Sequence, residues 1–241
     1  MANSYDLIGK LAVVTGGAKS IGAAVAERLV ASGARVWIWD VSPVETPRCS
    51  SAVVDVTKPH QIDAAVERII DEGLRVDILV NNAGYLGRLN AFDEHDSNDW
   101  RRIIEVNLIG MLNVAHAIVP HMRRWGGGRI INMGSLAGKE GLPFLAAYSA
   151  ASAGVIAFTK ALSREVVSSR ILVNCVALGP IDTDMIRNLG PDAVDAMIND
   201  SPMKRLGSPE EVAHLVAWLC SEASRFNAGA VFDMSGGRAR Y

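Results

Sequence analysis

The chain has 241 residues, of which 49% are hydrophobic and 21% are charged, and its 24 basic and 26 acidic residues leave a net charge of −2. This length and composition fit one large domain with a sizeable core and argue against a disordered chain. Because there is no basic excess, a nucleic-acid-binding protein is not expected.

Seven short runs are predicted to be β-strands, because they are apolar almost throughout, which is typical of strands covered on both faces. They lie at 11–15, 35–40, 52–55, 76–81, 129–133, 171–177 and 230–234. Helical periodicity lies between them, at about 21–32, 60–72, 97–124, 147–167 and 209–221. The alternation predicts a parallel sheet in a single α/β domain that spans residues 1–241.

Two further segments bear on organisation. Residues 182–207 contain Gly, Pro and Asn between moderate helical patterns, so we expect a mobile lid over a site. Residues 141–159 carry no charge for nineteen residues, but a proline and polar residues interrupt them, which favours a buried helix over a membrane span.

The setting of the protein is indicated by its cysteines and its first residues. Cys49, Cys175 and Cys220 form neither a C-x-x-C pair nor a disulfide framework, which favours a reducing compartment. The segment MANSYDLIGK lacks the basic and apolar parts of a secretory signal. We therefore expect a cytoplasmic protein without a membrane anchor.

The first predicted strand runs into a glycine-rich turn, Thr15–Gly22, and a helix follows. Glycines there let the backbone approach a pyrophosphate, and the free N–H groups of the helix N-terminus favour an anion. An ordinary strand–helix turn would look similar. Under the functional interpretation the cofactor contacts Gly16, Lys19, Ser20, Ile21 and Gly22.

The ends of the next two strands bear on which cofactor binds. Asp40 follows Gly16 by twenty-four residues, and its carboxylate would accept hydrogen bonds from both ribose hydroxyls and repel a 2′-phosphate. The basic side chain of Lys19 could hold a 2′-phosphate, which favours NADP. We give the Asp40 carboxylate more weight, so NAD is favoured over NADP. Asp55 and Val56 at the third strand are either an adenine contact or a helix cap.

At this point the sequence resembles the short-chain dehydrogenase/reductase family over essentially its full length. The marks that carry the resemblance follow in the family's order: Thr15–Gly22, Asn81-Asn82-Ala83-Gly84, Asn107 in Asn-Leu-Ile-Gly, Ser135, Tyr148, Ile181-Asp182-Thr183 and Ser235-Gly236-Gly237. The nearest branch contains 3-oxoacyl-acyl-carrier-protein reductases and bacterial sugar or sugar-acid dehydrogenases. The resemblance implies a doubly wound parallel seven-stranded sheet of Rossmann type. It also implies a homotetramer, which the apolar surface of the helices at 97–124 and 147–167 favours too.

The resemblance further implies hydride transfer between a nicotinamide and a carbonyl or carbinol carbon, with no metal. In such a site Ser135 hydrogen-bonds the substrate oxygen, Tyr148 exchanges its proton, and Asn107 holds a water of the proton relay. Asn82, Ala83 and Gly84 would lie beside the adenosine, and Gly179, Ile181 and Thr183 beside the nicotinamide, which Tyr148 also contacts. The substrate would contact Ser135, Tyr148, Leu142, Leu178 and Met185. Each of the three catalytic candidates also has an ordinary structural interpretation, as a strand-end cap, a helix-start aromatic and a surface helix residue.

Three positions depart from the family pattern: Ser20 replaces the middle glycine of the turn, Leu178 replaces a proline before Gly179, and Ser152 replaces the lysine of Y-x-x-x-K. Ser20 is a good helix N-cap, so cofactor binding is expected to survive. The lysine would lower the pKa of the phenol and bind the ribose. Ser152 is counted with the catalytic candidates because it could hydrogen-bond a water in the space left, but it brings no charge. A free phenol has a pKa of about 10, so the loss of the charge is expected to impair alcohol oxidation more than ketone reduction.

We therefore interpret the chain as an NAD(H)-dependent oxidoreductase that interconverts a small secondary alcohol or sugar-like hydroxyl and its carbonyl. The alternative is a catalytically weak dinucleotide-binding protein, a sensor or partner subunit, which the missing lysine keeps open. Lys139 is the nearest cation in the sequence that can replace it, although nothing in the sequence directs it towards Tyr148.

Overall fold

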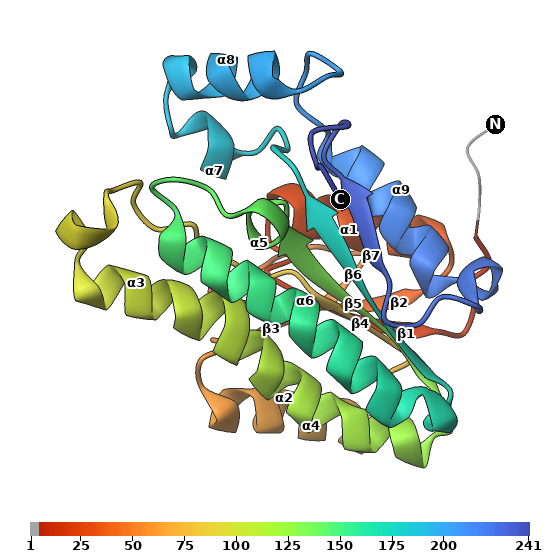
Figure 1. Ribbon diagram of the computed structural model, residues 1–241. Coiled ribbons are helices and arrows are strands. Elements are labelled where there is room, and N and C mark those ends of the chain that lie inside the picture. The colour runs from red at the N-terminus through yellow and green to blue at the C-terminus, as the bar shows by residue number, and fades with distance from the viewer. Residues whose placement is uncertain (1–4) are drawn as a thin grey trace.

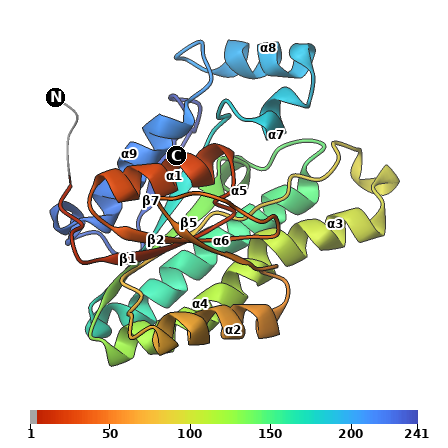
Figure 2. The same ribbon diagram turned by 180° about the vertical axis from the view of Figure 1, so that it is seen from behind.

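The computed structural model describes residues 5–241 and contains a seven-stranded sheet in the order β3-β2-β1-β4-β5-β6-β7. Every strand pair is parallel. Helices cover both faces of this sheet, as Figures 1 and 2 show. The predicted α/β class and the seven-stranded Rossmann-type sheet are confirmed.

The strands are β1 (Leu11–Thr15), β2 (Arg35–Asp40), β3 (Ser50–Val53), β4 (Ile78–Asn81), β5 (Gly128–Ser135), β6 (Ile171–Leu178) and β7 (Val231–Met234). The helices are α1 (Ser20–Ala31), α2 (Pro59–Asp71), α3 (Ser97–Ile104), α4 (Gly110–Arg124), α5 (Ala137–Glu140), α6 (Ala146–Val166), α7 (Asp184–Arg187), α8 (Pro191–Asp200) and α9 (Pro209–Cys220). Each predicted helix has a counterpart within two residues, whereas α5 was not predicted.

Burial of the strands follows their place in the sheet. All residues of β1 and β4 are buried, whereas β3 and β7 are half-exposed because each has a neighbour on one side only. The expectation that all strands are covered on both faces is therefore wrong for the two edges. The third strand also ends at Val53 rather than at Asp55, so Asp55 lies in the following loop.

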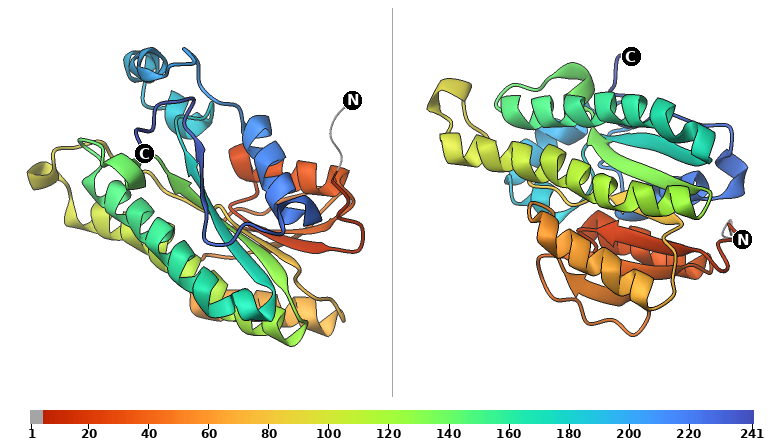
Figure 3. Two further views of the ribbon diagram at one scale, coloured as in Figure 1. Left: turned by 45° about the vertical axis from the view of Figure 1, so that its right-hand side comes forward. Right: turned by 90° about the horizontal axis from the view of Figure 1, so that it is seen from below.

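Two hydrophobic clusters hold the layers together. On one face Val25 of α1 and Val216 of α9 pack with strand residues, and on the other face Ile62 of α2 and Ile118 of α4 do so. The left view of Figure 3 shows α1 and α9 on one side of the sheet and α4 and α6 on the other. The helices thus cover the two faces of the sheet.

A continuous helical rod runs from Ser97 to Arg124 and contains one π-helical turn, Glu105–Ile109, between α3 and α4. Of the helices in residues 5–241, this rod is the one whose length and composition suffice to cross a membrane. Its inner face packs into the core through Ile118 and Met122, as that of a core helix does. The uncharged residues 141–159 form a loop and much of α6, which is buried on one face only.

The order of the strands creates a switch point, because the chain moves from β1 outward to β3 and then returns to β4 on the other side of β1. Ligands of open parallel sheets bind at the carboxyl ends of strands beside such a point. Above this edge lie α7 and α8 (Figure 1). They lie in the segment 182–207, for which a lid is predicted, and a bridge between Ile181 and Gly207 joins the two ends of this segment.

Candidate active site

The glycine turn and the loop after β4 are fastened together at the switch point. The Thr15 hydroxyl accepts the N–H groups of Asn82 at 3.0 Å and Ala83 at 3.1 Å. In return, the Asn82 amide donates to the carbonyls of Thr15 at 3.1 Å and Gly16 at 3.0 Å. The sequence thus brings these two predicted cofactor segments side by side, through a threonine whose hydroxyl had no predicted role.

Two glycines of the turn are required by close approach. A Cβ on Gly22 would lie 2.1 Å from the Gly16 carbonyl oxygen, and one on Gly16 would lie 2.8 Å from the Cα of Ala83. Gly16 also has a φ of 64°, which favours glycine. The result is a bare backbone cradle at the start of α1, and such a cradle fits a dinucleotide pyrophosphate.

Ser20 takes the place of a glycine and keeps its backbone shape. Its φ is 53°, in the left-handed region that costs a residue with a Cβ about 1–2 kcal/mol. The expectation that Ser20 caps the helix is wrong, because Lys19 occupies the N-cap position and no side chain caps there. Ser20 is the first helical residue, and α1 begins without a side-chain cap.

Asp40 lies at the end of β2, next to the turn. Its Oδ2 accepts the N–H of Ala18 and its Oδ1 that of Ser42, both at 3.0 Å. These bonds fix the carboxylate at the mouth of the cradle and leave lone pairs for further donors. The side chain of Lys19 is exposed, and within residues 5–241 it has no ion-pair partner.

The Asp55 carboxylate accepts the N–H and the hydroxyl of Thr57, at 2.9 and 2.8 Å. It does not cap α2, whose N-cap is Lys58. Val56 is buried against Gly110, so its side chain belongs to the core, and its carbonyl accepts the amide of Asn113. Of this predicted pair, Asp55 and the Val56 backbone remain candidates for an adenine contact.

Asn107 lies in the π-helical turn and braces the loop after Gly84. Its amide donates to the carbonyls of Tyr85 and Ile103, and its Oδ1 accepts the Tyr85 N–H at 3.0 Å. Both amide hydrogens are therefore used within the chain, which leaves one lone pair on Oδ1 for a water. The interpretation as an exposed helix residue does not fit these contacts.

Ser135 ends β5 and Tyr148 lies in the first turn of α6, and their side chains are hydrogen-bonded. Burial raises the pKa of Tyr148 above its ordinary value, while the bond from Ser135 stabilises the phenolate and partly opposes the shift. No cation contributes to the pKa of this phenol. The absence of a positive neighbour beside Tyr148 is the feature that distinguishes this pair from the family pattern.

The backbone at the lysine position of the motif packs against α5. Ser152 is buried, and a Cβ on Gly138 would lie 2.5 Å from its backbone carbon, so α5 packs directly against α6 there. Lys139 on α5 does not supply the positive charge of the missing lysine. Its ammonium pairs with Asp233 at 3.1 Å and lies 5.5 Å from the centre of the Tyr241 ring.

The residues expected at the nicotinamide differ in what they can offer. Ile181 is buried in the core and at the bridge to Gly207, so only its backbone remains for a ligand. Thr183 caps α7, its hydroxyl accepting the N–H of Ile186. Gly179 approaches Ser235 so closely that a Cβ would lie 2.8 Å from the Cα of that residue.

The expected substrate residues are spread around the edge. Leu178 is half-buried opposite Ser135 in the sheet, and Met185 is exposed on α7. Leu142 donates its N–H to the Ser149 hydroxyl and lines a cavity of about 550 Å³ beside α5. Neither Ser135 nor Tyr148 lines that cavity, so the structure does not join all the substrate candidates in one pocket.

Sequence reasoning missed two features of the rim. Phe144, in the loop before α6, has a φ of 64° and is 59% exposed. The Tyr85 hydroxyl donates to Asp99 at 2.7 Å, and His95 Nε2 lies 2.9 Å from the same carboxylate. The helical spacing of His95 and Asp99 was a usable signal, whereas nothing in the sequence indicates the backbone of Phe144.

The pKa of Asp99 is about 2. Burial disfavours the charged form, but the Arg88 N–H, the Tyr85 phenol and His95 together outweigh it. The carboxylate thus holds the loop after β4 against α3.

Comparison with known proteins places the chain among dinucleotide-dependent enzymes. Residues 16–239 match the family model described as enoyl-(acyl carrier protein) reductase. The 3-oxoacyl-[acyl-carrier-protein] reductase FabG of Chlamydia muridarum is 36% identical, over 97% of this chain and 98% of that protein. The 2-dehydro-3-deoxy-L-rhamnonate dehydrogenase (NAD(+)) of a Sphingomonas strain is also 36% identical, over 97% and 96%. The solved aldohexose dehydrogenase of Thermoplasma acidophilum superposes with a TM-score of 0.93 at 29% identity, covering 99% of this chain and 97% of that one.

Proposed function

Since this chain belongs to the short-chain dehydrogenase/reductase family of oxidoreductases, we propose that it interconverts a small secondary alcohol or sugar-like hydroxyl and its carbonyl, with NAD(H) as cofactor. The pair of Ser135 and Tyr148 carries the proposal, because Ser135 ends β5 at the same carboxyl edge of the sheet at which the glycine turn follows β1. The preference for NAD rests on Asp40, whose carboxylate the Ala18 N–H holds at the cradle.

The chain's own residues divide the work as follows. Gly16, Gly22 and the N-terminus of α1 hold the pyrophosphate, and Asp40 accepts the ribose hydroxyls. A bound nicotinamide supplies or accepts the hydride. Ser135 orients the substrate oxygen, and Tyr148 gives that oxygen a proton in reduction and removes one in oxidation.

The direction of efficient turnover follows from the phenol. Reduction uses neutral Tyr148, which is the form that burial favours. Oxidation needs the phenolate, and with Ser152 in the lysine position no nearby cation stabilises it. We therefore infer slow oxidation at neutral pH that accelerates as the pH rises.

The test is turnover and binding measured separately. Purified protein is assayed with NADH and with NADPH against 3-oxoacyl thioesters and keto sugar acids, and Tyr148→Phe serves as the control. Reduction that disappears in Tyr148→Phe supports the proposal. Tight NAD binding without turnover on any substrate or at any pH contradicts it and supports the dinucleotide-binding alternative.

Cofactor choice has its own test. In fluorescence titrations NAD(H) should bind more tightly than NADP(H), and Asp40→Ala should narrow the difference, because the carboxylate repels a 2′-phosphate. Equal affinities in the parent would instead assign the decision to Lys19.

We also propose a cytoplasmic homotetramer. Only 33% of the apolar window within Ser97–Arg124 is buried in one chain, which leaves apolar surface for another copy. Light scattering that shows a stable monomer at micromolar concentration would remove this proposal.

A further inference from the structure

A cavity of about 410 Å³ lies at the opposite end of the sheet from Ser135 and Tyr148. Its walls include Lys10, Ile78 and Gly128, which stand where β1, β4 and β5 begin. The eight residues of β5 span about 23 Å between the two ends, at about 3.3 Å per residue. This cavity is therefore separate from the dinucleotide cradle and from the catalytic pair.

Basic side chains dominate the walls of this cavity. Its lining contains five basic and two acidic residues, which leaves an excess of three positive charges. The basic residues are Lys10, Arg75, Arg129, Arg170 and Arg225. They come from five separate parts of the chain, so the fold gathers at one point charges that the sequence keeps apart.

The two carboxylates neutralise part of this charge. Asp77 is nearly buried, pairs with Arg75 and, at 3.8 Å, with Lys10, and accepts the N–H of Leu11. Glu222 is 76% exposed and pairs with Arg129 at 3.1 Å. Both acids are thus engaged by residues on the near walls.

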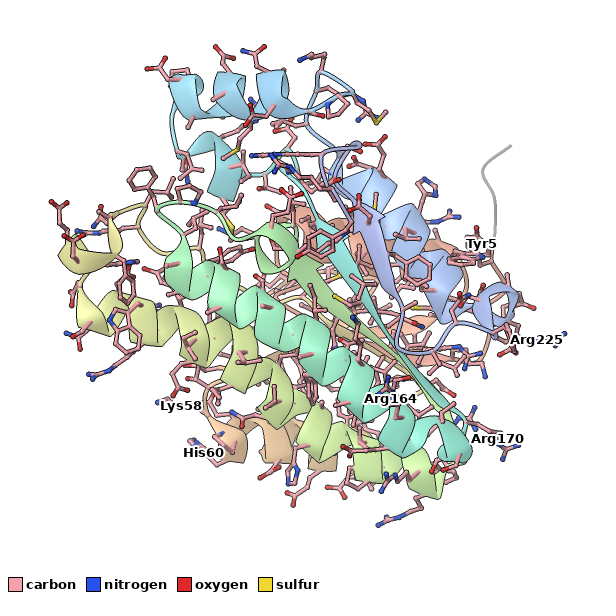
Figure 4. All side chains as sticks on the ribbon, in the orientation of Figure 1. Tyr5, Lys58, His60, Arg164, Arg170 and Arg225 are labelled. Atoms are coloured by element: carbon pink, nitrogen blue, oxygen red, sulfur yellow. The ribbon has the colours of Figure 1, made fainter. Side chains whose placement is uncertain are left out.

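Two guanidinium groups remain without an acidic partner in the part of the chain that the structure describes, those of Arg170 and Arg225. Figure 4 labels both at the end of the molecule that lies away from α7 and α8. Arg170 has a φ of 61°, and a Cβ on Gly126 would lie 3.1 Å from its guanidinium. The turn before β6 and the glycines before β5 therefore hold this arginine at the cavity.

Arg129 supplies a further donor. Only 13% of its side chain is exposed, and its Nε is buried without a hydrogen-bond partner, although its other nitrogens bond to Gly128 and Glu222. The hydrogen-bonding capacity of this guanidinium is therefore not used up within the described part of the chain.

From these observations we propose that the cavity binds the phosphate groups of a phosphorylated small molecule. Planar guanidinium groups match phosphate oxygens in pairs, and three excess charges suit a multiply charged anion. The volume lies within the range of small-molecule sites. The Trp125 indole, 52% exposed, forms an aromatic wall on which a planar group of the ligand packs.

Calorimetric titration of pyrophosphate and of ADP tests this, at low salt and with NAD saturating so that the first site is filled. Both probes should bind the parent. Arg170→Gln and Arg225→Gln should each weaken binding by roughly tenfold, since each removes a charge-assisted pair. Arg164→Gln is the matched control: Arg164 is exposed near the end of α6, lines no part of the cavity, and should leave both affinities unchanged.

Trp125→Ala, which removes the aromatic ring, distinguishes the sources of the phosphate. A loss of ADP affinity with unchanged pyrophosphate affinity identifies a ligand with a planar ring, whereas an ADP affinity equal to that of the parent identifies a simple phosphate compound. The proposal is overturned if neither probe binds the parent at millimolar concentration. It is also overturned if Arg164→Gln weakens binding as much as Arg170→Gln does, because the attraction would then be general surface charge.

Discussion

The cofactor side and the substrate side of the carboxyl edge are built differently. On the cofactor side, the hydroxyl of Thr15 accepts two hydrogen bonds and the side-chain NH2 of Asn82 donates two, and a Cβ on Gly22 would have no room. On the substrate side, neither α7 nor α8 contains a buried residue, and Phe144 stands exposed in a left-handed conformation.

The difference indicates which half is ready before any ligand arrives. Tight packing and satisfied hydrogen bonds give a region high local stability, whereas few buried contacts give a region that opens easily. The cradle is therefore preformed, and the lid is expected to order on the substrate. The lysine of the family motif would connect the two sides, because it would bind the cofactor ribose and act on Tyr148. In this chain no cation contributes to the pKa of Tyr148.

The largest expected effect comes from restoring that cation. Ser152→Lys should raise alcohol oxidation at pH 7 by roughly ten- to a thousandfold, because the ammonium lowers the pKa of Tyr148. The gain should shrink towards pH 10, where the phenol begins to ionise unaided. A pH–rate profile with saturating NAD measures both.

The control for this change is the double variant with Tyr148→Phe, in which the lysine has no phenol to act on and the gain should vanish. Ser152 is buried against Gly138, so a melting curve of Ser152→Lys must accompany the rates. A parent that already oxidises quickly at pH 7 would show that another group supplies the base.

Gly22 offers the most direct test of the difference in packing between the cofactor side and the substrate side. Its Cβ would meet the Gly16 carbonyl at 2.1 Å, so Gly22→Ala should lower the free energy of unfolding by about 3 kcal/mol and abolish NAD binding. Gly141→Ala, on the substrate side, is the matched control. Gly141 has a φ of 68°, a ψ of 125° and open space around it, so only the backbone cost of about 1–3 kcal/mol should appear in urea unfolding, and NAD binding should remain. Equal losses at both sites would refute the difference in packing.

Asp99 tests how firmly the rim between the halves is held. Its folded pKa of about 2 lies below the ordinary 3.8, so its ionised form stabilises the protein above about pH 4, and this contribution disappears as the pH falls towards 2. Asp99→Asn should therefore cost about 2 kcal/mol at pH 7, and less at each lower pH. Chemical unfolding at pH 7, 5 and 3.5 measures the difference in free energy of unfolding between the parent and the variant. If this difference stays constant with pH, lost packing rather than the lost charge explains it.

The smallest expected effect concerns the backbone of Ser20, on the cofactor side. Ser20→Gly should raise the free energy of unfolding by about 0.5–1 kcal/mol, because glycine tolerates a φ of 53° although it is more flexible when unfolded. Ser20→Ala retains a Cβ and should bring no gain. Thermal melts of the three proteins decide, and a stabilised alanine variant would contradict the backbone explanation.

The sequence was most informative where periodicity and spacing determine structure. Apolar runs located the strands, and the positions of Asp40 and Ser135 at strand ends placed both at one edge. It was least informative about backbone conformation in loops and about contacts between residues far apart in the sequence. Nothing in the composition distinguishes the left-handed Phe144 from an ordinary loop residue, and the pairing of Lys139 with Asp233 joins residues that are ninety-four positions apart. Ser152 could be identified as unusual from the motif, but its burial under α5 required the fold.

The π-helical turn at Glu105–Ile109 marks the place where the rod accommodates one residue more than regular α-helix would. Deleting one residue here should therefore restore regular α-helical winding with α3 and α4 on about the same faces, so Ile118 stays in the core. The cost falls on Asn107, which lies in this turn and would lose its hydrogen bonds to Tyr85. Elsewhere in the rod, a one-residue deletion would rotate one half against the other by about 100°, so the position of a length change matters more than its size.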